Sequence, residues 1–219
     1  VILLILPVVG LVGSNNLSTA IIILGIAVIL IFVANPQFLP FLWIGGTGVG
    51  FIGIFLSLES YRLERLAIWR NPELYEKGYQ TMQGLYAIGS GGLFGVGLGE
   101  SMQKLGFVPE AQNDMIFSII CEELGLTGAV AVLVIFGLLI WRLMVIATWT
   151  KDLFGTLLAA GVMGHIMIQV ILNVAVVTNT IPNTGITLPF VSYGGTSVVF
   201  LLLEMGIALS VSRDVRKEQ

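Results

Sequence analysis

The segment PEAQNDMIFSIICEELG, residues 109–125, places acidic side chains at the edge of an apolar run. Asp114 directly precedes the apolar residues Met115–Cys121. A carboxylate held near apolar surface has a raised pKa, and such a group is suited to act as a general base. An aspartate here would equally well cap the helix expected from Met115 onward or form an ion pair at its start. The residue pattern leaves both interpretations of Asp114 open.

Further polar side chains occur inside apolar stretches, where an ionisable or hydrogen-bonding group is a functional candidate. His165, Gln169 and Asn173 recur every four residues and would share one face of a helix. That face either lines a polar pathway or makes interhelical hydrogen bonds. Glu204 lies within the last apolar stretch and either has a function or pairs with another helix.

Two segments rich in glycine and proline complete the candidate sites. The stretch GSGGLFGVGLG, residues 89–99, matches neither G-x-G-x-x-G nor the phosphate-binding loop pattern, so nucleotide binding has no support. Its glycines either let a bulky ligand approach the backbone or let helices pack tightly. The loop IPNTGITLPFVSYGG, residues 181–195, is typical of an ordered irregular hairpin. In this loop Ser192 and Tyr193 either bind a polar ligand or satisfy backbone groups.

The composition indicates a membrane protein. Of the 219 residues, 56% are hydrophobic and 11% are charged, whereas about a quarter of the residues in soluble domains are charged. The net charge of −3 and the lack of basic clusters argue against a nucleic-acid partner. Cys121 is the single cysteine, so an intrachain disulfide is excluded, and the lone His165 excludes multi-histidine metal sites.

The elements that position these residues must be helices, because lipid offers open strands no hydrogen-bond partners. A span requires about 20 apolar residues. We predict spans at about 18–34, 39–58, 124–141, 153–178 and 194–212, and a truncated one at 1–12. The predicted fold class is all-α, a single polytopic transmembrane bundle over residues 1–219 with about six spans. Val1 begins within an apolar run without an initiator methionine, so we expect a C-terminal fragment of a longer protein.

The distribution of charge predicts the orientation of this bundle. Residues 59–123 hold 14 of the 23 charged residues and form a large loop region. Within it, residues 61–70 have the mixed character of an interfacial helix, and Asn71-Pro72 suits the start of another helix. Arg142 and Lys151 bracket a short loop, and the C-terminus is also basic, so both are expected to face the cytoplasm. The loop region 59–123 and the hairpin 179–193 are then both expected outside.

Two long stretches resemble one family. They are GYQTMQGLYAIGSGGLFGVGLGESMQKLGFVPEAQNDMIFSIICEELG (78–125) and IPNTGITLPFVSYGGTS (181–197). Together they are similar to the SEDS proteins of bacterial membranes, which comprise FtsW, RodA and SpoVE. The Asn113-Asp114 pair, the GLGES stretch and residues 190–196 favour FtsW and SpoVE over RodA. Family members have about ten membrane helices, so the resemblance implies that this chain supplies the last six.

The resemblance implies a peptidoglycan glycosyltransferase of the bacterial cytoplasmic membrane. Such an enzyme polymerises lipid II at the extracytoplasmic face for cell division, sporulation or cell shape. The family's essential aspartate lies in a pattern matched here by Pro109, Glu110 and residues 113–117, so Asp114 would be the general base. The implied protein partners are a class B penicillin-binding protein, which is a transpeptidase, and other division or elongation proteins. The implied ligands are lipid II and undecaprenyl-linked glycan.

Around Asp114 we expect further substrate contacts. The candidates are Glu110, Gln112, Asn113, Lys104, Gly91, Gly92, Ser192, Tyr193 and Gly194. The diphosphate of lipid II requires cations, for which the candidates are Arg62, Arg65, Arg70, Lys77, Lys104 or a divalent ion, Mg²⁺ or Mn²⁺. No other cofactor is expected. The glycines of 89–99, the hairpin 189–195 and Asp114 are predicted to line one outward cavity.

Two other functions remain open at this point. A lipid II flippase would depend on the polar residues within the membrane more than on Asp114. A non-catalytic division scaffold would depend on neither. Polymerisation of lipid II by the protein and by an Asp114→Asn variant distinguishes these functions from a polymerase.

Overall fold

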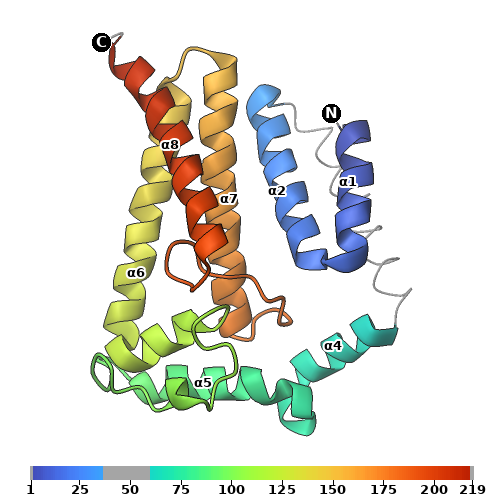
Figure 1. Ribbon diagram of the computed structural model, residues 1–219, viewed down its shortest axis with the longest axis vertical. Coiled ribbons are helices and arrows are strands. Elements are labelled where there is room, and N and C mark those ends of the chain that lie inside the picture. Colours follow the sequence, from blue (N-terminus) through green and yellow to red (C-terminus); the bar gives the residue numbers. More distant parts are fainter. Residues whose placement is uncertain (1, 37–59, 218–219) are drawn as a thin grey trace.

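The structure is a computed structural model that describes residues 2–36 and 60–217. Its α-helices are α1 (Ile2–Asn15), α2 (Leu17–Ala34), α4 (Ser60–Arg70), α5 (Tyr79–Gly91), α6 (Ile116–Trp149), α7 (Leu153–Val177) and α8 (Gly195–Lys217), joined by the 3₁₀ turns η1 (Pro72–Leu74), η2 (Glu76–Gly78) and η3 (Gln103–Leu105). In Figure 1, α6, α7 and α8 stand side by side, with α2 along α7 and α1 along α2. Helices α4 and α5 lie across one end, and the C-terminus is at the other. The all-α class is confirmed for the described residues.

Four helices in the described ranges are long and apolar enough to cross a membrane. They are α2, α6, α7 and Gly195–Arg213 of α8. The prediction of about six spans is therefore met only in part. Helix α1 has 14 residues, fewer than the roughly 20 that the hydrocarbon core requires. The span predicted at 39–58 lies outside the described residues.

Helices α2 and α7 pack through glycines. A Cβ on Gly25 would lie 2.6 Å from Ile168 Cδ1, and one on Gly164 would lie 2.8 Å from Ile29 Cδ1. At both positions the terminal methyl group of the facing isoleucine occupies the space that a Cβ would take, so an alanine would require that methyl group to move. Such packing of small residues is what holds helices together in lipid, where apolar burial between them gains little. This contact fixes α2 beside the helix that leads into the 179–194 segment.

Helix α6 is bent at Gly125, which has φ 66° and ψ −167°. Only glycine adopts this backbone conformation without strain. The nine residues before it, Ile116–Leu124, lie near α5 at a steep angle to the rest of α6 (Figure 1). The predicted start at residue 124 is correct for the upright part, but the helix itself begins at Ile116. The predicted loop region 59–123 therefore contains the first segment of α6 in addition to α4 and α5.

The glycine-rich stretch fastens this bend. At a break in a helix the terminal N–H and C=O groups lose their intrahelical partners. Here four backbone hydrogen bonds supply new ones: Val96 N to Glu122 O (2.9 Å), Gly97 N to Glu123 O (3.0 Å), Leu126 N to Gly92 O (2.9 Å) and Thr127 N to Leu93 O (3.1 Å). A Cβ on Gly91 would lie 1.9 Å from Cys121 O, and one on Gly95 would lie 2.1 Å from Glu123 O. Close packing, one of the two interpretations of residues 89–99, is confirmed.

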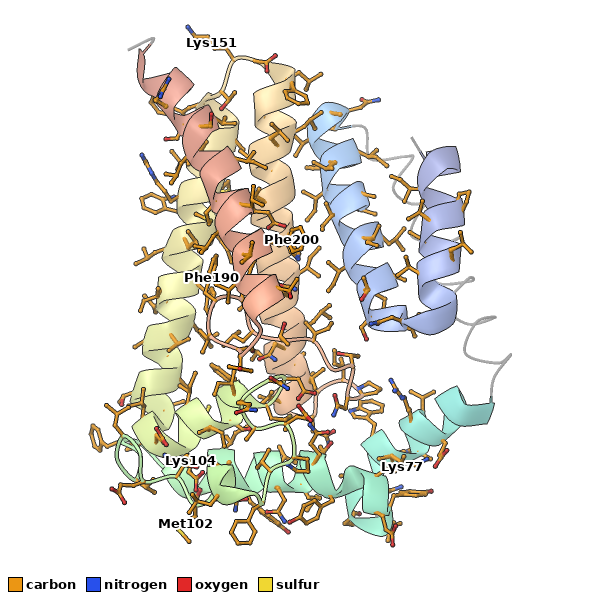
Figure 2. The ribbon with its side chains drawn as sticks, viewed as in Figure 1. Lys77, Met102, Lys104, Lys151, Phe190 and Phe200 are labelled. Atoms are coloured by element: carbon orange, nitrogen blue, oxygen red, sulfur yellow. The ribbon has the colours of Figure 1, made fainter. Side chains whose placement is uncertain are left out.

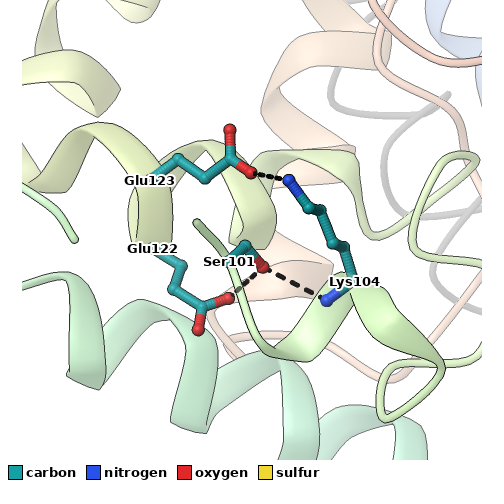
Figure 3. A network of polar contacts seen from close by, with 4 residues as sticks. All are labelled: Ser101, Lys104, Glu122 and Glu123. Atoms are coloured by element: carbon teal, nitrogen blue, oxygen red, sulfur yellow. Dashed lines mark hydrogen bonds and ion pairs between the residues drawn. The ribbon is translucent and has the colours of Figure 1, made fainter. Parts of the chain in front are cut away.

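A polar cluster continues the same attachment (Figure 3). Ser101 Oγ donates to the carboxylate of Glu122, and both side chains are buried. Ser101 Oγ in turn accepts from the backbone N–H of Lys104 at 3.1 Å. The Lys104 ammonium lies 2.7 Å from Glu123. The loop between α5 and α6 is thus tied to the first segment of α6 by backbone and side-chain bonds together.

The predicted helix at 61–70 corresponds to α4, Ser60–Arg70. Its interfacial position remains a prediction. The helix expected after Asn71 is only the 3₁₀ turn η1, which has Pro72 at its first position as predicted. The side chain of Asn71 makes no capping hydrogen bond, so the predicted cap is wrong.

Candidate active site

A cavity of ≈ 330 Å³ opens at the end of the bundle crossed by α4 and α5. It is lined by Glu64, Arg65, Ile68, Trp69, Lys77, Thr81, Asp114, Asn179, Asn183, Thr184 and Gly185. These residues come from α4, η2, the start of α5, the single residue Asp114 before α6 and the segment after α7. The wall combines both signs of charge with neutral polar and apolar side chains, a mixture that suits a site for a small molecule.

Asp114 is 8% exposed, and its carboxylate borders this cavity. Oδ1 accepts a hydrogen bond from Gln80 Nε2 at 3.3 Å. A Cβ on Gly185 would lie 4.0 Å from Oδ2, so the backbone of Gly185 faces the other oxygen. Met115, not Asp114, is the N-cap residue of α6, and no side chain caps that helix start. Within the described ranges Asp114 also forms no ion pair. The predicted cap is therefore wrong, and the predicted ion pair is not found among the described residues.

The surroundings raise the pKa of the Asp114 carboxyl above its ordinary value of 3.8. The main cause is burial, because the charged form loses water. The negative charge of Glu110 adds to this, while hydrogen bonds from the backbone N–H groups of Asp114 and Met115 and from Gln80 act in the opposite direction. The net effect is a carboxylate with increased proton affinity, which is the property of a general base.

The 181–195 hairpin holds the chain just before Asp114. Tyr193 N donates to Gln112 O at 2.8 Å, and Ser192 Oγ donates to Asn113 O at 2.6 Å. Ser192 Oγ is itself fixed, since it accepts from Leu188 N at 2.7 Å. The prediction that Ser192 and Asp114 belong to one region is confirmed by these bonds. An ordered irregular hairpin is also what the sequence predicted.

A second chain of hydrogen bonds reaches the carboxylate from its other side. Gly185 N donates to Asn183 Oδ1 at 3.0 Å, and Asn183 Nδ2 donates to Gln80 Oε1 at 3.1 Å. Gln80 Nε2 then donates to Asp114 and to Pro109 O at 3.2 Å. Because its oxygen is used by Asn183, the Gln80 amide must present its N–H₂ to Asp114. The hairpin thereby orients the group that binds the candidate base.

Helix α4 closes the cavity through a reciprocal contact. Trp69 Nε1 donates to Asn179 O at 3.0 Å, and Asn179 Nδ2 donates to Trp69 O at 3.4 Å. Asn179 has φ 55°, an uncommon conformation for a residue with a side chain. An ion pair of 2.9 Å between Lys77 and Glu64 links η2 to α4. Two of the cavity walls are thus joined by contacts between cavity residues themselves.

Three predicted substrate contacts gather in a different place. Lys104, Glu110 and Gln112 line a second cavity of ≈ 610 Å³, with Leu105, Val108, Ala111, Ile116 and Ile119. The Lys104 ammonium is already paired with Glu123. Asn113 uses its side-chain amide to donate to Glu110. These four residues surround the chain that carries Asp114 but, in the described part of the molecule, do not line its cavity.

The predicted cavity shared by the 89–99 glycines, the 189–195 hairpin and Asp114 is wrong. The described lining of the Asp114 cavity contains neither segment, and the hairpin contributes its earlier part, residues 183–185. Gly91 is buried against α6, and Gly92 is exposed next to it. The Tyr193 side chain is 75% exposed, and Gly194 is partly buried. The physical reason is that both glycine-rich segments serve backbone packing around α6.

The cation candidates can be separated by position. Arg65 and Lys77 line the Asp114 cavity, whereas Lys104 lines the second one. Arg70 is exposed, and the side chain of Arg62 lies outside the description. The described residues contain no group of three or more acidic, histidine or cysteine side chains placed to hold a metal ion. The need for a divalent ion, Mg²⁺ or Mn²⁺, stays a prediction.

The polar stripe on α7 makes contacts between elements. His165 Nδ1 lies 2.8 Å from a Glu204 oxygen, so α7 and α8 are joined by this pair. Asn173 donates to two backbone carbonyl oxygens, those of Asp114 and Ile186. Interhelical bonding, one of the two interpretations of this stripe and of Glu204, is confirmed for the pair His165 and Glu204. Asn173 instead binds the backbone of two segments outside the helices.

Sequence reasoning missed much of the site. The cavity residues Trp69, Asn179, Asn183 and Gly185 were not singled out as site residues. Gln80, which binds the Asp114 carboxylate, was not singled out either, although it stands in the quoted stretch GYQTMQG. Their neighbours in space lie far away in the chain: the Gln80 contact with Asp114 joins residues 34 positions apart, and that of Trp69 with Asn179 spans 110. Periodicity reports only local spacing, so it gave no signal for them.

Comparison with known proteins places this arrangement in a family. The relatives include stage V sporulation protein E of Bacillus subtilis, 45% identical over 201 residues, which cover 90% of this chain and 55% of the relative. A protein of Trichlorobacter lovleyi named "Probable peptidoglycan glycosyltransferase FtsW" is 37% identical over 203 residues, 92% of this chain and 53% of that protein. The chain thus spans about half the length of the relatives it matches.

Solved structures agree. A chain of a peptidoglycan synthase complex, described as structurally coordinating polymerization and crosslinking, superposes with TM-score 0.79 and 31% identity over 97% of this chain and 60% of that one. A mutant of the rod shape determining protein RodA from Thermus thermophilus superposes with TM-score 0.64 and 30% identity, over 97% of this chain and 55% of that one. The family model for FtsW, RodA and SpoVE, described as cell cycle proteins, matches residues 1–217. This chain therefore belongs to the FtsW/RodA/SpoVE family.

Proposed function

We propose that this chain is part of a peptidoglycan glycosyltransferase that polymerises lipid II, with Asp114 as its general base. The observation that carries the proposal is the buried Asp114 carboxyl group, which borders a cavity and has a raised pKa. It does not cap α6, and it forms no ion pair with another described residue. The names of relatives support the reaction class, since one is called a peptidoglycan glycosyltransferase. A role in division or sporulation is likewise proposed from the names of relatives.

The chemistry follows from the substrate. A sugar hydroxyl of one lipid-linked disaccharide attacks the anomeric carbon of another, the bond to diphosphate breaks, and the hydroxyl proton goes to Asp114. Diphosphate leaves without a proton, so a base is the group that the protein must provide. General-base catalysis contributes about 10²–10⁴-fold to the rate, and holding both lipids in place removes part of the entropic barrier.

The other cavity residues suit this reaction. Arg65 and Lys77 line the same cavity as Asp114, and cations in that position would stabilise the leaving diphosphate. For Lys77 this requires its ion pair with Glu64 to open. Gln80 fixes one carboxylate oxygen and leaves the second facing the Gly185 backbone. The cavity lies at an end of the helix bundle, where two substrates with tails in the bilayer can both reach it. We place this end on the extracytoplasmic side of the cytoplasmic membrane, because the opposite end carries the basic short loop and C-terminus.

We propose a class B penicillin-binding protein as the partner. The supporting observation is the similarity to a chain of a synthase complex in which polymerization is coordinated with crosslinking. A flippase finds less support, because His165, Asn173 and Glu204 make contacts between elements instead of lining the Asp114 cavity.

The test is glycan polymerisation from lipid II by the purified full-length protein and its Asp114→Asn variant. We expect the variant to lose about 10²–10⁴-fold in rate, since the amide keeps the shape but cannot accept the proton. The variant should be at least as heat-stable at neutral pH. Because the pKa of Asp114 is raised in the folded state, the buried negative charge lowers the free energy of unfolding when the pH is above that pKa. The neutral amide of asparagine removes this destabilisation. A well-folded Asp114→Asn protein that polymerises at the wild-type rate would refute the assignment and leave a flippase or scaffold.

A further inference from the structure

The three residues 112–114 present three consecutive backbone carbonyl oxygens to the rest of the site, and each is bound by a different donor. The hairpin binds the first two, through Tyr193 N and Ser192 Oγ. The third, Asp114 O, accepts from Asn173 Nδ2 at 2.8 Å. Asn173 is the one donor of the three that comes from a membrane-spanning helix, α7. The backbone of Asp114 is therefore attached directly to the bundle.

Asn173 has a second bond. The same Nδ2 donates to Ile186 O at 2.7 Å, and the residue is 0% exposed. Two carbonyl acceptors fix the orientation of the amide, because only its N–H₂ group can donate to both. Its Oδ1 is buried and has no hydrogen-bond partner in the described part of the protein. A buried acceptor without a partner costs free energy, which the two bonds donated by Asn173 must offset.

The two carbonyls held by Asn173 belong to a residue that lines the cavity and to the neighbour of another residue that lines it. One is that of Asp114. The other is that of Ile186, the residue after Gly185. The backbone of Gly185 faces Asp114 Oδ2, since a Cβ placed on Gly185 would lie 4.0 Å from that oxygen. Gly185 borders the cavity and has φ 69°, a backbone conformation that favours glycine. The buried amide of Asn173 thus connects the residue that carries the carboxylate with the backbone segment opposite that carboxylate.

We infer that Asn173 is a positioning residue, which sets the distance between the Asp114 carboxylate and the Gly185 backbone by holding the carbonyls of Asp114 and Ile186 on one amide group. This inference rests on the proposed function, since it concerns the geometry of the proposed base. Asparagine fits because one short side chain supplies two N–H donors. Leucine of similar size supplies none and would leave two carbonyls buried without partners.

The test compares Asn173→Leu with Gln169→Leu in the full-length protein. Both remove an amide from the same face of α7, one turn apart, but only Asn173 binds the backbone of Asp114. We expect kcat for lipid II polymerisation to fall about 10²-fold for Asn173→Leu, the effect of a small misplacement at a reacting centre, with KM little changed. The matched Gln169→Leu variant should keep most of its activity. Asn173→Ser retains one donor and should fall between wild type and Asn173→Leu, which keeps the test usable if the leucine variant folds poorly.

The pH profile separates positioning from simple loss of stability. When the Asp114 segment is loosened, water reaches the carboxylate, so the acid limb of the rate profile should move to lower pH in Asn173→Ser and Asn173→Leu. The other charged groups around Asp114 (Glu64, Arg65, Lys77 and Glu110) are unchanged in these variants. A mere loss of folded protein would scale the whole profile and leave the limb in place.

The outcomes distinguish this inference from the proposed function. An inactive Asp114→Asn protein together with equal effects of Asn173→Leu and Gln169→Leu, and an unmoved acid limb, would overturn the positioning role alone. An active Asp114→Asn protein would overturn the proposed function. The expected result is an inactive Asp114→Asn variant, a fall in kcat specific to position 173 and a shifted limb.

Discussion

Asp114 lies one residue before the N-cap position of α6, and this offset determines what its carboxylate is available for. An aspartate at the cap would spend one oxygen on a helix N–H and would have a lowered pKa. Here Met115 occupies that position, and the carboxylate turns to the cavity, where burial raises its pKa. The sequence identified the residue, but two of its three interpretations depended on the exact start of a helix, which a sequence pattern locates only to within a few residues.

Gln80 offers a prediction about pH. Its hydrogen bond to Asp114 Oδ1 lowers the pKa of the carboxyl, in opposition to the larger effect of burial. Replacement in Gln80→Met should therefore raise that pKa further. A base works only when deprotonated, so activity falls as the pH drops through the pKa of Asp114. The acid limb of the polymerisation rate should move to higher pH in Gln80→Met, as measured from initial rates across the acidic range.

The control for this experiment is Gln83→Met on the same helix, α5. Gln83 is not among the hydrogen-bond partners of Asp114, so its loss should leave the limb in place. A limb that moves to lower pH in Gln80→Met would show that the amide does not stabilise the charged carboxylate. Equal profiles for both variants would remove Gln80 from the site.

At the scale of elements, the bend in α6 brings the first segment of the helix under the bundle and places Asp114 at the cavity. Gly125 makes the bend possible, and a Cβ there would lie 2.4 Å from Gly95 N and 2.6 Å from Leu93 O. Gly125→Ala should therefore lower the free energy of unfolding by about 1–3 kcal/mol through backbone strain, and the close contacts of the Cβ should lower it further. The measurement is the apparent melting temperature in detergent, together with the polymerisation rate.

Gly137 is the matched control because it lies in the same helix and nothing is within 4 Å of a Cβ placed on it. Gly137→Ala should leave the melting temperature unchanged or raise it, since alanine favours helix. If the two variants melted at the same temperature, the bend would not depend on glycine at position 125.

Sequence patterns predicted the upright elements well and the transverse ones poorly. The span predicted at 153–178 agrees with α7, Leu153–Val177, because a charge-free stretch marks what lies in hydrocarbon. The same rule placed the start of α6 near residue 124, since Glu122 and Glu123 are charged. It could not show that these acids continue a helix before a bend, where Ser101 and Lys104 bind them. That information lies in a contact between separate elements and not in local composition.

At the scale of the whole molecule, the polar segments separate to the two ends of the bundle. Lys77, Met102 and Lys104 lie at the end with α4 and α5, and Lys151 lies at the opposite end, between α6 and α7 (Figure 2). The 181–195 hairpin joins the first group through its bonds to residues 112 and 113. The predicted grouping of 59–123 with 179–193, away from the C-terminus, is confirmed for the described residues, while the side of the membrane that each end faces remains a prediction.

Thiol labelling of intact cells determines that side. Met102 is a suitable position because its side chain is 61% exposed and takes no part in the Glu122 and Glu123 contacts, whereas a cysteine at Lys104 would remove an ion pair. The buried native Cys121 is first replaced in a Cys121→Ser background. An impermeant reagent should label Met102→Cys in intact cells and Lys151→Cys only after the membrane is permeabilised, because basic short loops stay in the cytoplasm. Labelling of Lys151→Cys but not Met102→Cys in intact cells would place the Asp114 cavity on the cytoplasmic side, where it could not build glycan strands outside the membrane.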